Sequence, residues 1–296
     1  MNEARLAGCG TALITPFTAE GELDEAALRS LVEWQIEEGV DFLVPIGSTG
    51  EAATLTPAEQ RRVVEIVVDV VGGRVPVVAG AGSNDTRRAV AASRALCEIG
   101  VTHLLHVAPM YNRPPQRGIV QHFRAIVEAS ELPVIIYNVP GRTGCNIEAE
   151  TTLEIAELPN VAGIKEASGN LAQIAEILRN RPPCFSVLSG DDALTLEVMR
   201  SGGDGVISVV SNATPRAMTE LVARCRAGEY TAARAIHERL EPWMRAAFVE
   251  SNPMPVKAAL AMLGRARNVL RLPLVPLDER HESMLRESLE FAGALA

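Results

Sequence analysis

Apolar residues recur along this chain in two alternating patterns. Short apolar runs, typical of buried strands, are followed by longer segments in which apolar residues repeat at the spacing of one helix face. In one such segment, Leu28, Val32 and Ile36 lie on a single stripe. Gly39 then supplies the residue type that most often follows the end of a helix. The alternation predicts a protein built from β-strands and α-helices in turn.

The strand-length runs are apolar throughout most of their length and do not alternate with polar residues. Such runs are typical of strands that are buried on both faces of a parallel sheet. The eight predicted strands are residues 10–15, 42–46, 75–79, 103–107, 134–137, 161–165, 185–188 and 205–209.

A helical pattern follows each predicted strand. The clearest helix start is Thr56, because a threonine N-cap with Pro57 at the first helical position and Glu59 at the third forms a capping box. The predicted helices that follow strands are residues 24–38, 56–71, 86–99, 116–129, 148–158, 171–179, 193–200 and 215–226.

Strand followed by helix, repeated eight times, is typical of a parallel sheet closed into a (β/α)8 TIM barrel. A doubly wound open sheet is the alternative, and it is disfavoured because no domain break interrupts the alternation. After residue 226 only helical patterns follow. The sequence therefore predicts an α/β protein, with a barrel in residues 1–226 and a C-terminal helical extension, residues 227–296, packed on it. The predicted helices of the extension are residues 230–248, 255–263 and 277–291.

Composition narrows the class of protein further. Hydrophobic residues make up 47% and charged residues 22% of the 296 residues, as expected of a globular protein with a sizeable core. No run resembles a transmembrane span, and a net charge of -9 argues against nucleic acid or an anionic membrane as the main partner. The widely spaced cysteines form no CxxC pair, which favours reduced thiols and a cytoplasmic location. They are Cys9, Cys97, Cys145, Cys184 and Cys225.

Lys165 is the most informative single residue. It closes the apolar run 161–165, and a strand would place it on the same face as Val161 and Gly163, with room beside its amine. Burial lowers the pKa of a lysine, and the free amine is the form that attacks a carbonyl to make a Schiff base. Alternatively, the amine reaches water at the strand end or pairs with Glu166.

Further candidates lie where the other predicted strands end, because reactive residues of such barrels gather at the C-terminal ends of strands. Gly190, in the loop after the seventh predicted strand, is a candidate substrate contact. The loops are residues 47–51 (GSTGE), 109–114 (PMYNRP), 137–144 (YNVPGRTG) and 189–192 (SGDD).

The side chains in these loops suit a reaction of a keto acid. Forming an imine requires proton transfers, and Tyr137 at the adjacent strand end can carry them. Ser48 and Tyr111 could extend that path into a relay of hydroxyl groups. Arg142 offers a bidentate fork for a substrate carboxylate. The hydroxyls of Ser48 and Thr49, with the backbone N–H groups of their glycine-bounded turn, can hold a second carboxylate.

Together these motifs resemble those of the dihydrodipicolinate synthase / N-acetylneuraminate lyase superfamily, class I aldolases that condense or release pyruvate. The resemblance extends from about Gly10 to Gly264. It is strongest to the synthase branch, whose members join pyruvate to L-aspartate 4-semialdehyde on the diaminopimelate route to lysine. The shared motifs, in order, are GSTGE, YNRP, YNVPGRTG, GIKEASGN, SGDD, GVISV and ESNPMPVK.

The resemblance implies a role for each catalytic candidate. Lys165 would form the Schiff base, and Tyr137 would donate and accept protons. Ser48 and Tyr111 would complete the relay, with serine standing where many members have threonine. In this family the tyrosine equivalent to Tyr111 comes from a neighbouring subunit, which implies a homotetramer built from tight dimers.

For substrate binding, the resemblance implies that Thr49 and the backbone of Ile207 contact pyruvate. Arg142 would meet the carboxylate of the semialdehyde at the site entrance. Neuraminate lyases resemble this chain at the lysine and the tyrosine but have no arginine in that loop, so Arg142 favours a carboxylated second substrate. Two alternatives stay open: a sugar-acid or neuraminate-type aldolase with the same lysine, and a barrel that binds small anions without turnover.

No metal and no cofactor is expected, because the imine itself serves as the electron sink. Asp191 and Asp192 precede a predicted helix, where acidic residues are more often caps than metal ligands. His103 and His106 lie three apart on a predicted strand, hence on opposite faces, and make a poor ligand pair.

Inhibition by lysine is not expected either. Lysine-inhibited members of the family have histidines on the helix after the GSTGE loop, a serine after its glutamate, a glutamate on the third helix and a second tyrosine before YNRP. Of these regulatory positions only Asn84 persists here, and Arg88 would repel the ammonium group of a bound lysine. The residues that differ are Ala52, Pro57, Gln60, Arg88 and Met110.

Overall fold

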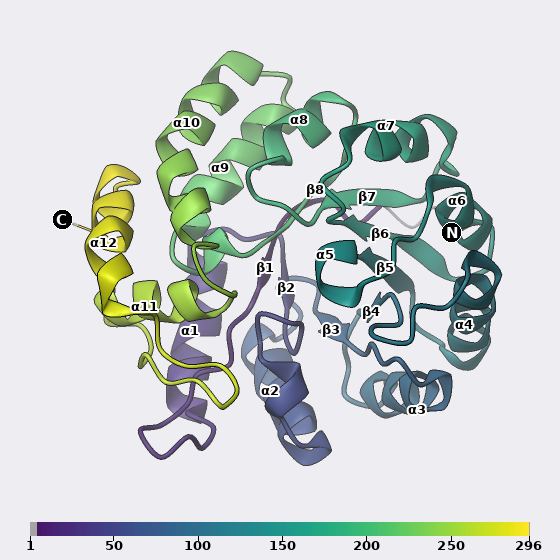
Figure 1. The fold of residues 1–296 in the computed structure, drawn as a ribbon, viewed down its shortest axis with the longest axis horizontal. Helices are drawn as coiled ribbons and strands as arrows, with labels where there is room; N and C mark the ends of the chain where they lie inside the picture. Colours follow the sequence, from purple (N-terminus) through teal and green to yellow (C-terminus); the bar gives the residue numbers. More distant parts are fainter. Residues whose placement is uncertain (1–4, 296) are drawn as a thin grey trace.

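Parallel strands form a barrel with helices arranged around it (Figure 1), in a computed structural model that describes residues 5–295. The sheet order is β2-β1-β8-β7-β6-β5-β4-β3, and an isolated parallel bridge between Leu43 and Val77 joins its two ends. The predicted (β/α)8 barrel is therefore confirmed, and the open sheet is excluded. The strands are β1 (Gly8–Ala12), β2 (Phe42–Val44), β3 (Val78–Gly80), β4 (His103–Val107), β5 (Val134–Asn138), β6 (Val161–Glu166), β7 (Ser186–Ser189) and β8 (Gly205–Ser208).

The helices around the barrel follow the predicted order. The capping box is present: the Thr56 hydroxyl accepts from the Glu59 backbone N–H, and the Glu59 carboxylate accepts from the Thr56 N–H. The helices are α1 (Glu25–Glu37), α2 (Pro57–Val71), α3 (Thr86–Cys97), α4 (Gln116–Ala129), α6 (Ala149–Ala156), α7 (Leu171–Asn180), α8 (Thr195–Arg200) and α9 (Pro215–Arg226).

Some predicted boundaries are wrong, for local reasons. β3 starts at Val78 and not at Val75, because Pro76 has no N–H for the sheet and the Val77 N–H donates to the Thr102 hydroxyl. A short helix, α5 (Pro140–Thr143), occupies part of the loop after β5. Proline at its start and Gly144 in the left-handed conformation after its end account for it.

The C-terminal extension packs against α9 (Figure 1), and Arg265 lies 4.3 Å from the centre of the Trp34 ring of α1. Trp243 is fully buried and donates its indole N–H to the Val210 carbonyl in the segment after β8. Leu285 and Leu289 belong to the same hydrophobic cluster as Leu28. Because that cluster contains residues of both parts, the division of the chain at residue 226 stays a prediction. The extension comprises α10 (Tyr230–Ala246), α11 (Met254–Met262), a 3-10 turn (Glu279–His281) and α12 (Glu282–Phe291).

Within residues 5–295, every helix is too short or too polar to cross a bilayer.

Candidate active site

The carboxyl ends of the barrel strands surround a cavity of about 180 Å³. Most of the candidate residues line it, and they come from the ends of four strands, β2, β5, β6 and β7, or from the loops that follow them. Tyr111 and Ile207 are not among the lining residues. The candidates that do line the cavity are Ser48, Thr49, Tyr137, Arg142, Lys165 and Gly190.

Lys165 and Tyr137 lie side by side on β6 and β5, where they are register partners. The Lys165 ammonium nitrogen is 4.4 Å from the centre of the Tyr137 ring, and Lys165 is only 5% exposed. Burial lowers the pKa of Lys165 to about 8, with Arg142 adding to the effect and Asp192 opposing it. Burial also raises the pKa of Tyr137, which keeps its phenol protonated. The lowered pKa makes the free amine of Lys165 more accessible near neutral pH, and a protonated phenol lies beside it.

The alternative that Lys165 is solvated or paired with Glu166 is wrong. The Glu166 carboxylate accepts from the side-chain amides of Asn138 and Gln173, each at 3.0 Å, and from the Ser168 backbone N–H at 2.6 Å. These donors, from β5, α7 and the loop after β6, hold the carboxylate among neutral groups. The amine of Lys165 is left facing the cavity.

Thr49 and Arg142 are connected by a residue to which the sequence analysis gave no role. The Asn252 side-chain amide donates to the Thr49 hydroxyl at 2.9 Å, and its backbone carbonyl accepts from Arg142 Nη2 at 3.2 Å. Asn252 lies between α10 and α11 and also lines the cavity. Its position within the ESNPMPVK motif was the signal that could have identified it. The helical extension therefore contributes to the candidate site.

The structure gives less support to the roles predicted for three other candidates, Ser48, Tyr111 and Ile207. Ser48 lines the cavity but is exposed. Tyr111 is 89% exposed and adopts a φ of 74°, an uncommon left-handed conformation for a tyrosine. Ile207 is fully buried on β8, where it pairs with Gly10 of β1. The predicted roles of these three residues stay predictions.

Asp191 and Asp192 do not cap α8 as expected, because that helix begins at Thr195. Asp192 instead accepts hydrogen bonds from the Val209 and Val210 N–H groups, at 2.9 and 3.2 Å, and so holds the segment that follows β8. Burial raises its pKa to about 6. Asp191 lines the cavity.

A parallel barrel with a desolvated lysine at the end of β6 and a tyrosine beside it defines the class of Schiff-base aldolases. Within that class, the chain belongs to the dihydrodipicolinate synthetase family, whose profile matches residues 5–292. The family inferred from the motifs is thus confirmed.

Individual relatives are similar to this chain in sequence and structure over nearly its whole length. A 4-hydroxy-tetrahydrodipicolinate synthase from Koribacter versatilis is 48% identical over 292 residues, covering 98% of this chain and 97% of the relative. The crystal structure of dihydrodipicolinate synthase from Thermotoga maritima has 43% sequence identity and a TM-score of 0.96, covering 98% of this chain and 99% of that one. A structure of the Cyanidioschyzon merolae enzyme with lysine bound has 42% identity and a TM-score of 0.95, covering 99% of each chain.

Proposed function

We propose that this protein is a 4-hydroxy-tetrahydrodipicolinate synthase, which condenses pyruvate with L-aspartate 4-semialdehyde. The observation that carries the proposal is the buried Lys165 amine beside the Tyr137 phenol, with Arg142 in the same cavity. Family membership and relatives at 48% identity support the choice of substrates. The two alternatives, a sugar-acid or neuraminate-type aldolase and a barrel without turnover, receive no such support from these relatives.

In the proposed mechanism, the Lys165 amine attacks the keto carbon of pyruvate, and loss of water gives the imine. Tyr137 supplies and recovers the protons, and Ser48 and Tyr111 relay them. Loss of a C3 proton converts the imine to an enamine, which attacks the aldehyde carbon of the second substrate. The amine of that substrate then displaces Lys165 and closes the ring, which frees the enzyme.

The proposal also assigns the contacts that bind the two substrates. Thr49 and the Ile207 backbone contact pyruvate in this proposal, and Gly190 contacts substrate from the loop after β7. Arg142 receives the carboxylate of the semialdehyde, because a guanidinium matches a carboxylate in both charge and geometry.

A coupled assay tests this function directly. Purified protein is given pyruvate and aspartate semialdehyde, and a reductase consumes the cyclic product. Lys165→Ala should abolish turnover, and Tyr137→Phe should lower kcat roughly 100-fold or more. Arg142→Ala should raise the KM of the semialdehyde at least about tenfold, because a charge-assisted hydrogen bond is lost.

Borohydride trapping separates the alternatives. If pyruvate is trapped on Lys165 but the semialdehyde gives no product, the synthase assignment is wrong, and sugar acids are the next second substrates to test. If pyruvate is not trapped by the wild-type protein, the Schiff-base mechanism itself is wrong.

The proposal includes a homotetramer in the cytoplasm, in which Tyr111 enters the site of a neighbouring subunit. The 89% exposure of Tyr111 in the single chain supports this arrangement. Mixing Lys165→Ala chains with Tyr111→Phe chains tests it, because a mixed dimer would then contain one site with both wild-type residues. Activity above that of either variant alone is expected. If the mixture is no more active than the separate variants, and mass measurement shows that mixed oligomers have formed, Tyr111 does not enter the neighbouring site.

A further inference from the structure

We propose that Glu51 is a positioning residue for the pyruvate-binding loop and that Lys257, from the C-terminal extension, holds it in place. This inference rests on the proposed function, since it concerns the loop assigned to the carboxylate of pyruvate. It makes the extension part of the binding machinery and not only a covering of the barrel.

The loop, residues 47–51, has a shape that needs support. Ile46, directly before the loop, and Glu51, its last residue, have φ values of 49° and 53°, a left-handed conformation that residues other than glycine rarely adopt. The Glu51 N–H donates to the Ser48 carbonyl at 3.1 Å, so the orientation of Glu51 and that of the loop are linked. Conformations of this kind persist when the surrounding structure holds them.

Lys257 supplies the first contact. Its amine lies 2.5 Å from Glu51 Oε1, and both side chains are fully buried. The same amine donates to the Val269 carbonyl at 2.8 Å and lies 4.0 Å from the centre of the Phe17 ring. Burial lowers the pKa of Lys257 to about 8, and the Glu51 carboxylate opposes that shift. A pair buried this deeply has a fixed geometry.

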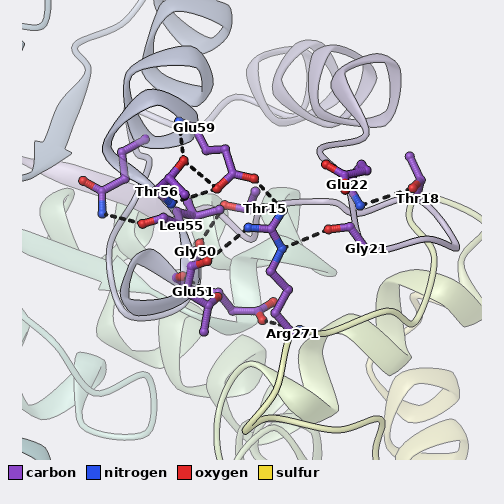
Figure 2. Close-up of polar contacts among 12 residues, drawn as sticks. Thr15, Thr18, Gly21, Glu22, Gly50, Glu51, Leu55, Thr56, Glu59 and Arg271 are labelled. Carbon is purple, nitrogen blue, oxygen red and sulfur yellow. Dashed lines mark hydrogen bonds and ion pairs between the residues drawn. The ribbon is translucent and has the colours of Figure 1, made fainter.

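Arg271 supplies the second contact. Its backbone N–H donates to Glu51 Oε2 at 3.1 Å (Figure 2). Its guanidinium donates to the carbonyls of Gly21 and Thr54 and pairs with Glu59 at 2.5 Å, which fixes Arg271 against α2. Both oxygens of the Glu51 carboxylate are therefore engaged by the extension.

The charge of Lys257 also matters for an anionic substrate. Glu51 is two residues from Thr49, the candidate contact for the carboxylate of pyruvate, and an unbalanced buried carboxylate there would repel that ligand. The ion pair places the loop and removes this repulsion at the same time.

Steady-state kinetics of Glu51→Gln test the inference. A glutamine has one acceptor oxygen for the two donors that face Glu51, so one contact must be lost. The KM of pyruvate is expected to rise at least about tenfold, as for loss of a hydrogen bond to a charged group. The KM of the second substrate and kcat should change much less. A pyruvate KM equal to that of the wild type, in a folded variant, would overturn the proposal.

Two further variants keep the test interpretable. The double variant Glu51→Gln/Lys257→Met buries no charge at this place but still lacks the ion pair between the loop and the extension, so its pyruvate KM should stay raised. A pyruvate KM equal to that of the wild type would mean that Lys257 only balances the charge of Glu51, and it would overturn the positioning role. Asp204→Asn is the matched control, because it breaks the ion pair with Arg181 at the opposite end of the barrel. It should lower thermal stability and leave the pyruvate KM unchanged.

Failure of this inference is distinct from failure of the proposed function. Borohydride trapping of pyruvate by the wild-type protein reports on the function alone. If the wild type traps pyruvate and the Glu51 variants trap it with unchanged pyruvate dependence, only the positioning role is wrong.

Discussion

Gly190 leaves open the space that the stem of Lys165 occupies. A Cβ atom on Gly190 would lie 3.1 Å from both Cγ and Cε of Lys165 and 2.6 Å from the Cβ atom of Ala167. The Gly190 N–H also donates to the Glu166 carbonyl at 2.8 Å, so the backbone at this point cannot easily retreat. The lysine amine is aimed into the cavity by packing on its stem.

Gly190→Ala should therefore displace the Lys165 amine and slow imine formation. Overpacking costs about 1–3 kcal/mol, which corresponds to a fall of roughly five- to 150-fold in the rate of borohydride trapping. Gly141→Ala is the matched control, because a Cβ atom there meets no atom within 4 Å. Equal trapping rates in the two variants would contradict this account of how Lys165 is oriented.

The rate of imine formation should rise with pH through about 8, because only the free amine of Lys165 attacks pyruvate. The Asp192 carboxylate favours the ammonium form and so raises the pKa of Lys165. Asp192→Asn should therefore move the midpoint of the trapping rate to lower pH. A midpoint that stays in place or moves upward would contradict the electrostatic link between the two residues.

Stability should fall in mild acid because of two buried histidines, His106 on β4 and His122 on α4. His106 contacts the Ser93 hydroxyl, His122 contacts the Thr86 hydroxyl, and burial lowers their pKa values to about 3 and about 4. Both are neutral when folded but take up protons near pH 6.5 when unfolded. The contribution of each histidine to the free energy of unfolding is therefore fully present above about pH 6.5. It is lost as the pH falls to about 4 for His122 and to about 3 for His106, by up to about 1.4 kcal/mol per pH unit for each.

Urea unfolding at several pH values measures this effect. His106→Gln removes one titrating group, so its stability should decrease less steeply over the same range even if it is less stable at neutral pH. An unchanged slope would show that the acid sensitivity arises elsewhere.

Lysine should not inhibit the condensation reaction at about millimolar concentration. Arg88 is exposed on α3, with its guanidinium 3.9 Å from Asp85. It therefore places a cation at the position where the family resemblance implies a glutamate in lysine-inhibited members, and a cation would repel the ammonium group of lysine. The Cyanidioschyzon merolae enzyme, which has been solved with lysine bound, is measured beside it in the same rate assay. Strong inhibition of both proteins would show that the binding site tolerates Arg88.

The barrel and the pairing of Lys165 with Tyr137 were predictable because they depend on local patterns. Apolar runs mark strands that are buried on both faces, and Lys165 and Tyr137 end two of them, so the topology brings the two side chains together. The contact between Asn252 and Thr49 spans 203 residues of sequence and follows from no periodicity. The same holds for Asp192, whose partners are backbone N–H groups beyond β8.

Because residues of the extension contact Glu51 in the GSTGE loop, this loop depends on residues that are synthesised late. Glu51 leaves the ribosome early, but Lys257 and Arg271 follow more than 200 residues later. A nascent chain that contains the whole barrel therefore already has Lys165 and Tyr137 but lacks both partners of the Glu51 carboxylate. If Lys257 and Arg271 hold this loop as proposed, residues 47–51 reach their final geometry only when nearly the entire polypeptide has been translated.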